Sequence, residues 1–488
     1  MSLTGRKTKI VATLGPASQS PEIIRALIEA GINVVRLNFS HGTHEDHKKI
    51  YDIVREEASN QQKHIAVLVD LCGPKVRIGP VEGGELFLED GSLIDLKFLL
   101  RPENMGKEGT SGELYIEAFD PVAVLRIGQK ALLADGRILL IASELGPDFV
   151  RCRVISGGKL RSRSGISVPD SQLNLPCLTD KDKADLLWAI ENKVDYIALS
   201  FVGSAKDVDD AHIEMEKFGA KIPVISKIER ASSLDEISKI VEASDAVMVA
   251  RGDLGLELPL ERVPAAQRFI ISEANLTGTP VITATQMLMS MVNEIRPTRA
   301  EVSDVYTAVR DGTDAVMLSD ETAIGKFPVQ SVQVLSSILL EAEKEAELNR
   351  PSLLGQKRAA RDKVADAVCF AASNASSKLA CSGIIACTES GSTARLMAKY
   401  RPQAPIFGAT SVRETLAKMA LYWGVEPLLI DISSNDASME YEVSQALLAA
   451  RDTYGLKPGS RVLITVGLRT KRTGSTNVME VREVPRTV

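Results

Sequence analysis

The strongest constraint on the fold is a pattern that repeats along the chain: a short apolar strand, a loop and an amphipathic helix. Strands that alternate with helices form parallel sheets with right-handed crossovers. Eight such strands are the number that closes a (β/α)8 TIM barrel of about 250 residues. The predicted strands are Lys9–Gly15, Asn33–Ser40, His64–Leu71, Asp195–Val202, Pro223–Glu229, Ala246–Leu254, Pro280–Met287 and Ala315–Thr322.

Helical periodicity fills most of the intervals between these strands. A doubly wound open sheet is the alternative, but eight similar units and the missing dinucleotide fingerprint favour the barrel. The predicted helices are Pro21–Ala30, Glu45–Ser59, Asp180–Asn192, Ala205–Phe218, Ser233–Ala243, Leu260–Leu276 and Ala300–Asp311.

One insertion interrupts the barrel between its third and fourth strands, at residues 74–175. Helical periodicity vanishes there, and short β runs predict a small antiparallel β domain, a small β-barrel, that covers the mouth of the larger barrel as a lid. The barrel domain is then residues 1–73 and 176–343. The β runs are Gly84–Leu88, Leu93–Phe98, Ala131–Leu133, Ile138–Ser143 and Phe149–Val154.

Residues 344–488 predict a C-terminal doubly wound α/β domain whose last strand is antiparallel. Its predicted helices are Asp362–Lys378, Ser392–Tyr400, Arg413–Tyr422 and Met439–Tyr454. Its predicted strands are Gly383–Thr388, Pro405–Ala409, Val425–Ile430, Arg461–Val466 and Val478–Val484.

Composition excludes several classes of function. The 488 residues carry a net charge of −6, without a basic run interleaved with aromatic residues, which argues against nucleic-acid binding. No apolar run is long enough to cross a bilayer, and the first residues contain no apolar signal core. The six cysteines fit no zinc or redox spacing. We therefore expect a soluble cytoplasmic protein without a membrane partner.

Polar and charged residues at the strand ends predict a site at the barrel mouth, where barrel enzymes do their chemistry. Lys227 and Glu229 share one face of a strand, although taken alone such a pair is more often a structural ion pair. Asp253 could instead cap a helix. The other strand ends contribute Arg36, Asn38, Ser40, His41, Asp70, Arg77, Arg251, Thr285 and Glu321.

The charges at these ends indicate phosphoryl chemistry. Glu229 and Asp253 offer hard carboxylate oxygens that suit Mg²⁺ or Mn²⁺, with water and substrate as further ligands. The cations Arg36, Arg77 and Lys227, and the amides around Gly252, suit an anionic substrate. A phosphorylated carboxylate fits both features, and phosphoryl transfer needs little beyond positioning and charge stabilisation.

Five motifs resemble the pyruvate kinase family, in order and spacing, from about Thr8 onward. They are Lys9–Ala17 (KIVATLGPA), Arg36–Gly42 (RLNFSHG), Ile225–Glu229 (ISKIE), Met248–Gly255 (MVARGDLG) and Arg296–Glu301 (RPTRAE). The resemblance implies transfer of phosphate from phosphoenolpyruvate to ADP, giving pyruvate and ATP. It also implies a homotetramer, with the lid closing over the bound nucleotide.

The resemblance implies a role for each mouth residue. Glu229 and Asp253 would hold the divalent metal, Lys227 would stabilise the transferring phosphoryl group and Arg36 would contact phosphate. Thr285 would help to deliver the proton to the enolate carbon. The substrate carboxylate would bind the amides of Ala250, Arg251, Gly252 and Asp253. The residues assigned to the nucleotide are Asn38, His41, Arg77 and Arg163.

Two departures from the family pattern are visible. Many members bind a monovalent cation with residues equivalent to Asn38, Ser40, Asp70 and Leu71 and carry Glu in a following Gly-Pro-Glu; here Lys75 stands in its place, which predicts activity without potassium. The lid Lys of the family is replaced by Ser164, and Arg163 is a candidate substitute.

The C-terminal domain carries a candidate effector site. A Ser/Thr-rich turn before a helix can cradle phosphate, although helix capping explains it equally well. The resemblance favours a sugar-phosphate or nucleotide effector, whose site would also include the late loop Arg469–Asn477. The candidate residues are Thr388, Glu389, Ser390, Gly391, Ser392, Thr393, Arg469, Lys471 and Arg472.

Two other readings compete. A metal-dependent lyase or aldolase of the phosphoenolpyruvate-binding barrels would use similar carboxylates, but the lid, the Lys227/Glu229 pair and the C-terminal domain count against it. A catalytically dead scaffold would be expected to lose mouth residues that are all present.

Overall fold

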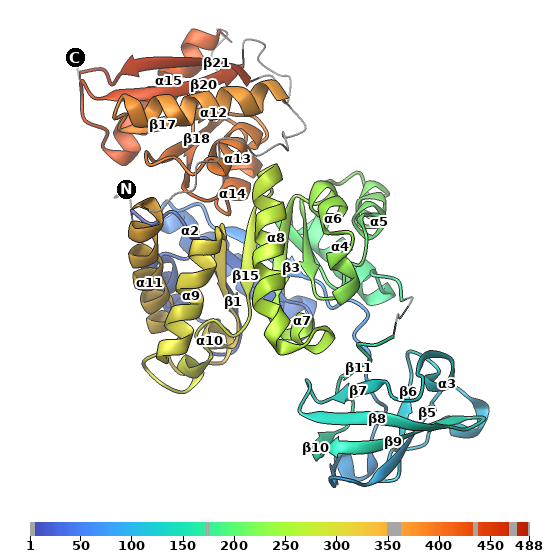
Figure 1. The fold of residues 1–488 in the computed structure, drawn as a ribbon. Helices are drawn as coiled ribbons and strands as arrows, with labels where there is room; N and C mark the ends of the chain where they lie inside the picture. Colours follow the sequence, from blue (N-terminus) through green and yellow to red (C-terminus); the bar gives the residue numbers. More distant parts are fainter. Residues whose placement is uncertain are drawn as a thin grey trace.

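The computed structural model describes residues 5–171, 173, 175–348, 363–432, 438–467 and 476–486. Three bodies follow one another in Figure 1, with the barrel in the middle, the inserted β domain at one end and the C-terminal α/β domain at the other. The inserted domain has a hydrophobic core of its own, whereas the barrel interior and the C-terminal domain share one.

Eight parallel strands close the barrel within the described part of the chain, as the sequence predicts. They are β1 (Lys9–Leu14), β2 (Val34–Asn38), β3 (Ala66–Asp70), β12 (Tyr196–Leu199), β13 (Val224–Ile228), β14 (Ala246–Ala250), β15 (Val281–Ala284) and β16 (Ala315–Leu318). Each strand pairs in register with the next around the ring.

The helices that pack around the barrel begin at strong caps. Thr43, Thr179 and Thr298 each form a capping box with an acidic residue three positions later. The helices are α1 (Pro21–Ala30), α2 (His44–Asn60), α4 (Asp180–Glu191), α5 (Ala205–Glu216), α6 (Ile237–Ala243), α8 (Val263–Thr277), α9 (Arg299–Asp311) and α11 (Pro328–Leu348).

Two of the predicted strands run on into residues that form helices. The sequence predicts that Ala246–Leu254 and Ala315–Thr322 remain extended, but α7 (Arg251–Glu257) and α10 (Asp320–Ala323) begin directly after β14 and β16. The ring of the barrel is only four to six residues deep, and the apolar Leu254 packs as the inner face of a helix. The two short helices therefore lie at the mouth.

The inserted domain comprises a six-stranded and a two-stranded sheet around its own core, with the short helix α3 (Pro121–Val124). The predicted antiparallel pattern holds except for β5 and β6, which are parallel. Strands β6, β10 and β11 were not predicted from the sequence. The strands are β4 (Glu85–Leu88), β5 (Leu93–Phe98), β6 (Glu113–Ile116), β7 (Lys130–Leu133), β8 (Ile138–Leu145), β9 (Phe149–Ser156), β10 (Gly158–Arg161) and β11 (Ile166–Ser167).

The C-terminal domain is a five-stranded sheet with helices on both faces, and its last strand is antiparallel as predicted. The strands are β17 (Gly383–Cys387), β18 (Ile406–Thr410), β19 (Val425–Leu429), β20 (Arg461–Gly467) and β21 (Thr476–Glu483). The helices are α12 (Lys363–Lys378), α13 (Ser392–Lys399), α14 (Arg413–Met419) and α15 (Met439–Tyr454).

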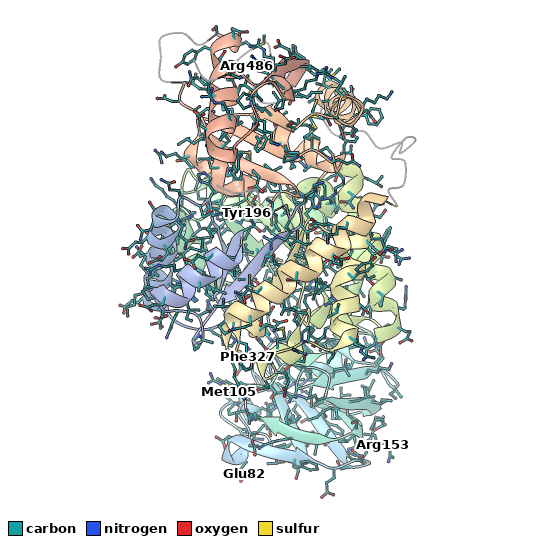
Figure 2. All side chains as sticks on the ribbon, turned by 90° about the vertical axis from the view of Figure 1, so that its left-hand side faces the viewer. Glu82, Met105, Arg153, Tyr196, Phe327 and Arg486 are labelled. Atoms are coloured by element: carbon teal, nitrogen blue, oxygen red, sulfur yellow. The ribbon has the colours of Figure 1, made fainter. Side chains whose placement is uncertain are left out.

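The C-terminal domain closes the amino-terminal end of the barrel, which we call the floor. The Tyr196 hydroxyl donates to the Lys418 carbonyl at 2.7 Å, and Lys9 Nζ donates to the Val425 carbonyl at 2.7 Å. Figure 2 shows Tyr196 at this boundary. Because the floor is covered, the opposite end is left for a site.

A repeated polar device stabilises the floor. At four places the residue just before a strand accepts a hydrogen bond from the first amides of the neighbouring strand, at 2.7 to 3.0 Å. These side chains satisfy backbone donors that the ladder leaves unpaired. The four residues are Asn33, Asp195, Asp245 and Asp314.

Candidate active site

A continuous chain of charges lies at the barrel mouth. Asp70, at the end of β3, accepts from Arg36 Nε at 2.6 Å and lies 3.2 Å from Lys227 Nζ. Lys227 Nζ lies 2.9 Å from Glu229 Oε1. All four side chains come from neighbouring or nearby strand ends and are mostly buried. The structure thus brings together the residues that the sequence analysis selected from β2, β3 and β13.

Electrostatic interactions fix the protonation states of these charged side chains at the mouth. Burial by itself would lower the pKa of Lys227, but the carboxylates of Asp70 and Glu229 outweigh burial and raise that pKa above its ordinary value. Burial opposes ionisation of Asp70, yet Lys227 and Arg36 hold its pKa below the usual range. Lys227 is therefore a cation, and Asp70 an anion, at neutral pH.

Two hydroxyl residues in this cluster were missed by sequence reasoning. Lys227 Nζ donates to Ser200 Oγ at 2.6 Å, and Ser200 in turn donates to the Leu71 carbonyl at 2.7 Å. Arg36 Nη1 donates to Thr13 Oγ1 at 3.0 Å. Ser200 and Thr13 stand at strand ends like the charged residues, but a single hydroxyl is too common in sequence to attract attention.

Glu229 and Asp253 form the candidate metal site. Glu229 Oε2 accepts the Phe201 amide at 2.7 Å, while burial and the nearby charge of Asp253 raise the pKa of Glu229, with Lys227 opposing. Among the described residues no cluster of three or more acidic, histidine or cysteine side chains forms a metal cage. Two carboxylates whose charges interact suit a hard divalent ion with water and substrate as further ligands, and Glu229 and Asp253 therefore fit Mg²⁺.

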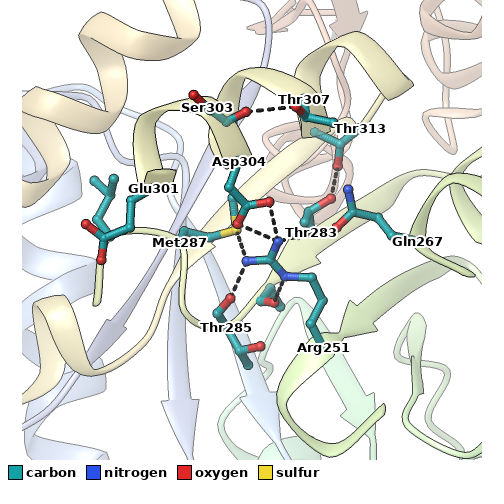
Figure 3. A network of polar contacts seen from close by, with 12 residues as sticks. Arg251, Gln267, Thr283, Thr285, Met287, Glu301, Ser303, Asp304, Thr307 and Thr313 are labelled. Carbon is teal, nitrogen blue, oxygen red and sulfur yellow. Dashed lines mark hydrogen bonds and ion pairs between the residues drawn. The ribbon is translucent and has the colours of Figure 1, made fainter. Parts of the chain in front are cut away.

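The turn after β15 brings Thr285 next to α7. The Gly252 amide donates to Thr285 Oγ1 at 2.9 Å, so the amide that we predicted to bind a substrate carboxylate is engaged by this hydroxyl. The Arg251 side chain is directed away from the mouth, toward Asp304 of α9, as Figure 3 shows. The prediction for Arg251 therefore concerns its backbone amide only.

A cavity of about 560 Å³ separates the lid domain from the barrel. Asp253 and Arg230 line it from the barrel, and Lys75 lines it from the hinge. The lid touches α7, because Ser167 Oγ donates to Glu257 Oε1 at 3.0 Å. The lid thus contacts the same short helix that carries Asp253.

The predicted nucleotide residues fall into two groups. Arg77 Nη1 donates to the Arg163 carbonyl at 2.9 Å, and both side chains are exposed where the lid joins the barrel. Asn38 and His41 lie on the segment after β2, where Asn38 Oδ1 accepts the Ser40 amide at 3.2 Å. In the described residues no hydrogen bond or ion pair joins one group to the other.

Asp70 and Leu71 of the predicted monovalent-cation region are engaged by neighbouring side chains, whereas Lys75 is exposed. Asp70 is committed to Arg36 and Lys227, and the Leu71 carbonyl accepts from Ser200. Lys75 is exposed beside Gly165 of the lid, and Ser164 Oγ donates to the Arg161 carbonyl at 2.8 Å.

The candidate effector turn joins β17 to α13. The Gly391 amide, in a left-handed conformation with φ +85°, donates to Thr388 Oγ1 at 2.9 Å. Thr393 Oγ1 lies 2.6 Å from Thr476 Oγ1, and the Glu389 carbonyl accepts from Thr415. The exposed Ser390 and Ser392 hydroxyls are 3.2 Å apart. The three predicted cations, Arg469, Lys471 and Arg472, lie outside the described residues.

Comparison with protein families assigns the chain. A model described as "Pyruvate kinase, barrel domain" matches residues 5–332, and one described as "Pyruvate kinase, alpha/beta domain" matches residues 366–482. The chain belongs to the pyruvate kinase family. The resemblance seen in the five sequence motifs is thereby confirmed.

Individual pyruvate kinases are similar over nearly the whole chain. "Pyruvate kinase 2" of Synechocystis sp. is 41% identical over 98% of this chain and 79% of that protein. The pyruvate kinase of Staphylococcus aureus is 39% identical over 98% of this chain and 80% of its own. A crystal structure of a pyruvate kinase from Cryptosporidium parvum matches with a TM-score of 0.88 and 33% identity, covering 99% of this chain and 97% of that one.

Proposed function

We propose that this protein is a pyruvate kinase that transfers phosphate from phosphoenolpyruvate to ADP. The bond from phosphorus to the enol oxygen breaks, a bond to a terminal oxygen of ADP forms, and the enolate takes up a proton to become pyruvate. The observation that carries the proposal is the mouth cluster, in which a protonated Lys227 lies between the carboxylates of Asp70 and Glu229, and Glu229 lies close enough to Asp253 to feel its charge. Family membership supports the same conclusion.

The side chains of the mouth would divide this work. Lys227 would face the negative charge that develops on the transferring phosphoryl group, and Arg36 would bind phosphate oxygens. Asp70 would keep both cations in position, because it contacts each of them. The hydroxyl of Thr285 would help to deliver the proton. Glu229 and Asp253 would hold Mg²⁺, which would neutralise charge on the substrate oxygens.

An assay of ATP formation from phosphoenolpyruvate, ADP and Mg²⁺ tests the proposal. The wild-type protein should form ATP, whereas Lys227→Met should lose activity while still binding Mg²⁺, since Glu229 and Asp253 remain. ATP formation by Lys227→Met near the wild-type rate would refute the role of Lys227. Cleavage or condensation of a phosphoenolpyruvate-type substrate without ADP would favour the lyase or aldolase reading. Absence of turnover altogether, even with sugar phosphates and nucleotides added, would favour a scaffold.

Independence from potassium is a separate part of the proposal. Lys75 brings a fixed positive charge to the hinge beside the predicted monovalent-cation region. Turnover should therefore be similar with and without potassium in sodium-free buffer, and Lys75→Glu should make turnover depend on potassium. Wild-type turnover that requires potassium would refute this part and leave the kinase proposal intact.

Regulation, assembly and location complete the proposal. The 388–393 turn would bind a sugar phosphate or a nucleotide, residues 74–175 would act as the lid, and the protein would work as a cytoplasmic homotetramer. Exposed apolar side chains on the barrel helices, such as Phe269 and Val302, are consistent with a subunit interface. Within the described residues no helix is long and apolar enough to span a membrane. Light scattering on the purified protein would measure the subunit number.

A further inference from the structure

We propose that Arg251 is a positioning residue for proton transfer. Its side chain holds the turn after β15 in a strained conformation, and this directs the Thr285 hydroxyl toward the mouth with its proton free to donate. The inference rests on the proposed function, in which Thr285 helps to deliver the proton to the enolate. It assigns to Arg251 a role different from substrate binding.

The turn after β15 needs an external support. Thr285 has φ +67° and Gln286 has φ +55°, so two consecutive residues other than glycine are in the left-handed region. A β-branched residue such as threonine rarely adopts this conformation, which persists only where surrounding contacts enforce it. Nothing in the local sequence favours it, because neither position is Gly, Asn or Asp.

The guanidinium group of Arg251 supplies that support. Nη2 donates to the Thr285 carbonyl at 2.6 Å and contacts Met287 Sδ at 2.8 Å, while Nε donates to the Ala284 carbonyl at 3.2 Å. These contacts span the strained turn from its first residue to its last (Figure 3). A planar fork with several donors suits this task better than the single ammonium of a lysine.

Arg251 is itself held from α9. Its Nη1 lies 2.6 Å from Asp304 Oδ2 and 3.4 Å from the amide oxygen of the buried Gln267. All three nitrogens of the guanidinium therefore have protein partners, and the side chain is not available to a substrate. The contacts link α9, on the outside of the barrel, to the turn that carries Thr285.

The contacts of Arg251 and Gly252 with the turn set the direction of the Thr285 hydroxyl proton. Thr285 Oγ1 accepts the Gly252 amide at 2.9 Å, which uses one lone pair and leaves the O–H as a donor. Among the described residues no protein acceptor takes this proton. With the backbone fixed by Arg251 and the oxygen fixed by Gly252, the proton is left for a group in the mouth.

Two rates test the proposal. NMR in D₂O, with Mg²⁺ and ATP present, follows the exchange of the pyruvate methyl protons for deuterium and reports the proton-transfer step. ATP formation reports phosphoryl transfer. Arg251→Met should slow methyl exchange by about 10²-fold, because small misplacements of a reacting group are that costly. ATP formation should fall less, since enolpyruvate can leave and pick up its proton in water. Asp304→Asn should have the same effect on a smaller scale, and Arg251→Lys should restore little.

Arg268→Met is the matched control. Arg268, on α8, likewise pairs with an aspartate of α9, at 3.1 Å from Asp311, but it is exposed, and in the described part of the chain no hydrogen bond or ion pair joins it to residues 284–287. This variant should keep both rates. Amide hydrogen exchange of residues 284–288 should accelerate in Arg251→Met and stay unchanged in the control. This measurement shows whether Arg251 holds the turn, and it needs no catalytic turnover.

The outcomes separate the two proposals. If the wild-type protein forms no ATP, the proposed function fails, and amide exchange at 284–288 still decides whether Arg251 holds the turn. If ATP forms and Arg251→Met leaves methyl exchange within about twofold of wild type, the positioning role is wrong. The role is equally wrong if methyl exchange and ATP formation fall by the same factor, or if Arg268→Met behaves like Arg251→Met.

Discussion

The two ends of the barrel both bury charge, yet they use it in different ways. At the floor, Lys9 and Asp314 bond to backbone groups and to the C-terminal domain: Lys9 Nζ reaches the Val425 carbonyl, and Asp314 accepts the Val281 amide and an ion pair from Arg401 at 2.8 Å. At the mouth, Lys227, Asp70 and Glu229 bond mainly to one another.

This difference separates a docking surface from a site. A charged side chain that is fully engaged by backbone groups at strand ends and by a neighbouring domain has no capacity left for a ligand, and it contributes to stability. A cluster of charges that pair mainly with each other at the open end of a barrel keeps a capacity for ligands. A charged residue at a strand end is therefore an ambiguous signal until its partners are known.

The largest expected effect comes from the same substitution at the two ends. Lys227→Met should reduce ATP formation by about 10³-fold, because it removes the cation that faces the transferring phosphoryl group. Lys9→Met should leave the rate per folded molecule unchanged and lower the melting temperature, because the Val425 carbonyl loses its donor. Steady-state kinetics and calorimetry on both variants measure the contrast. A tenfold or greater loss of rate in Lys9→Met would contradict the contrast between the two ends of the barrel.

The next effect concerns stability at the floor. Asp314→Ala should destabilise the protein by about 3 kcal/mol, because Arg401 stays buried without its ion pair and the Val281 amide without its acceptor. Denaturant unfolding of the two proteins gives the value. If the variant were as stable as wild type, the view of the floor as a docking surface would be wrong.

The smallest effect is a difference in pH dependence. The pKa of Asp70 is lowered, since Lys227 and Arg36 outweigh burial, so Asp70 adds stability above its unfolded pKa that is lost as the pH falls through the folded pKa. Burial raises the pKa of Asp314 in spite of Arg401, so its ionisation removes stability as the pH rises.

The destabilisation by Asp70→Asn should thus grow with pH, and that by Asp314→Asn should shrink, each by about 1 kcal/mol for a shift of one pKa unit. Melting temperatures below about pH 4 test Asp70, whose folded pKa lies under the unfolded value, and melting temperatures from about pH 4 upward test Asp314, whose folded pKa lies over it. Parallel slopes in the two variants would contradict the assigned pKa directions.

Much of the fold was visible in the sequence, because hydrophobic periodicity is a local signal. Helix α1 and strand β5 have the predicted bounds, and the antiparallel last strand of the C-terminal sheet was also predicted. Errors gathered at the mouth, where Arg251–Leu254 and Asp320–Thr322 turn from expected strand into helix. Within the lid, β6, β10 and β11 were missed, since strands of two to four residues carry too little pattern.

The sequence predicted only part of the candidate site. Lys227, Glu229, Arg36 and Asp70 stand out because charge at the end of an apolar run is unusual, and the structure brings these four together. Ser200 and Thr13 were invisible, because hydroxyl residues are frequent everywhere. For Arg251 the motif favoured the substrate, whereas its partners lie on β15 and α9.

The order of residues was enough to determine the barrel, the inserted domain, the C-terminal domain and the residue types available to a site. Each of these follows from the periodicity of apolar residues and from charges that interrupt it. Tertiary structure alone decided which charges pair, since pairing joins residues far apart in the chain, such as Arg251 with Asp304 and Lys9 with Glu426. Burial is also a property of the packed molecule, and it is burial together with partners that sets the opposite pKa shifts of Asp70 and Asp314.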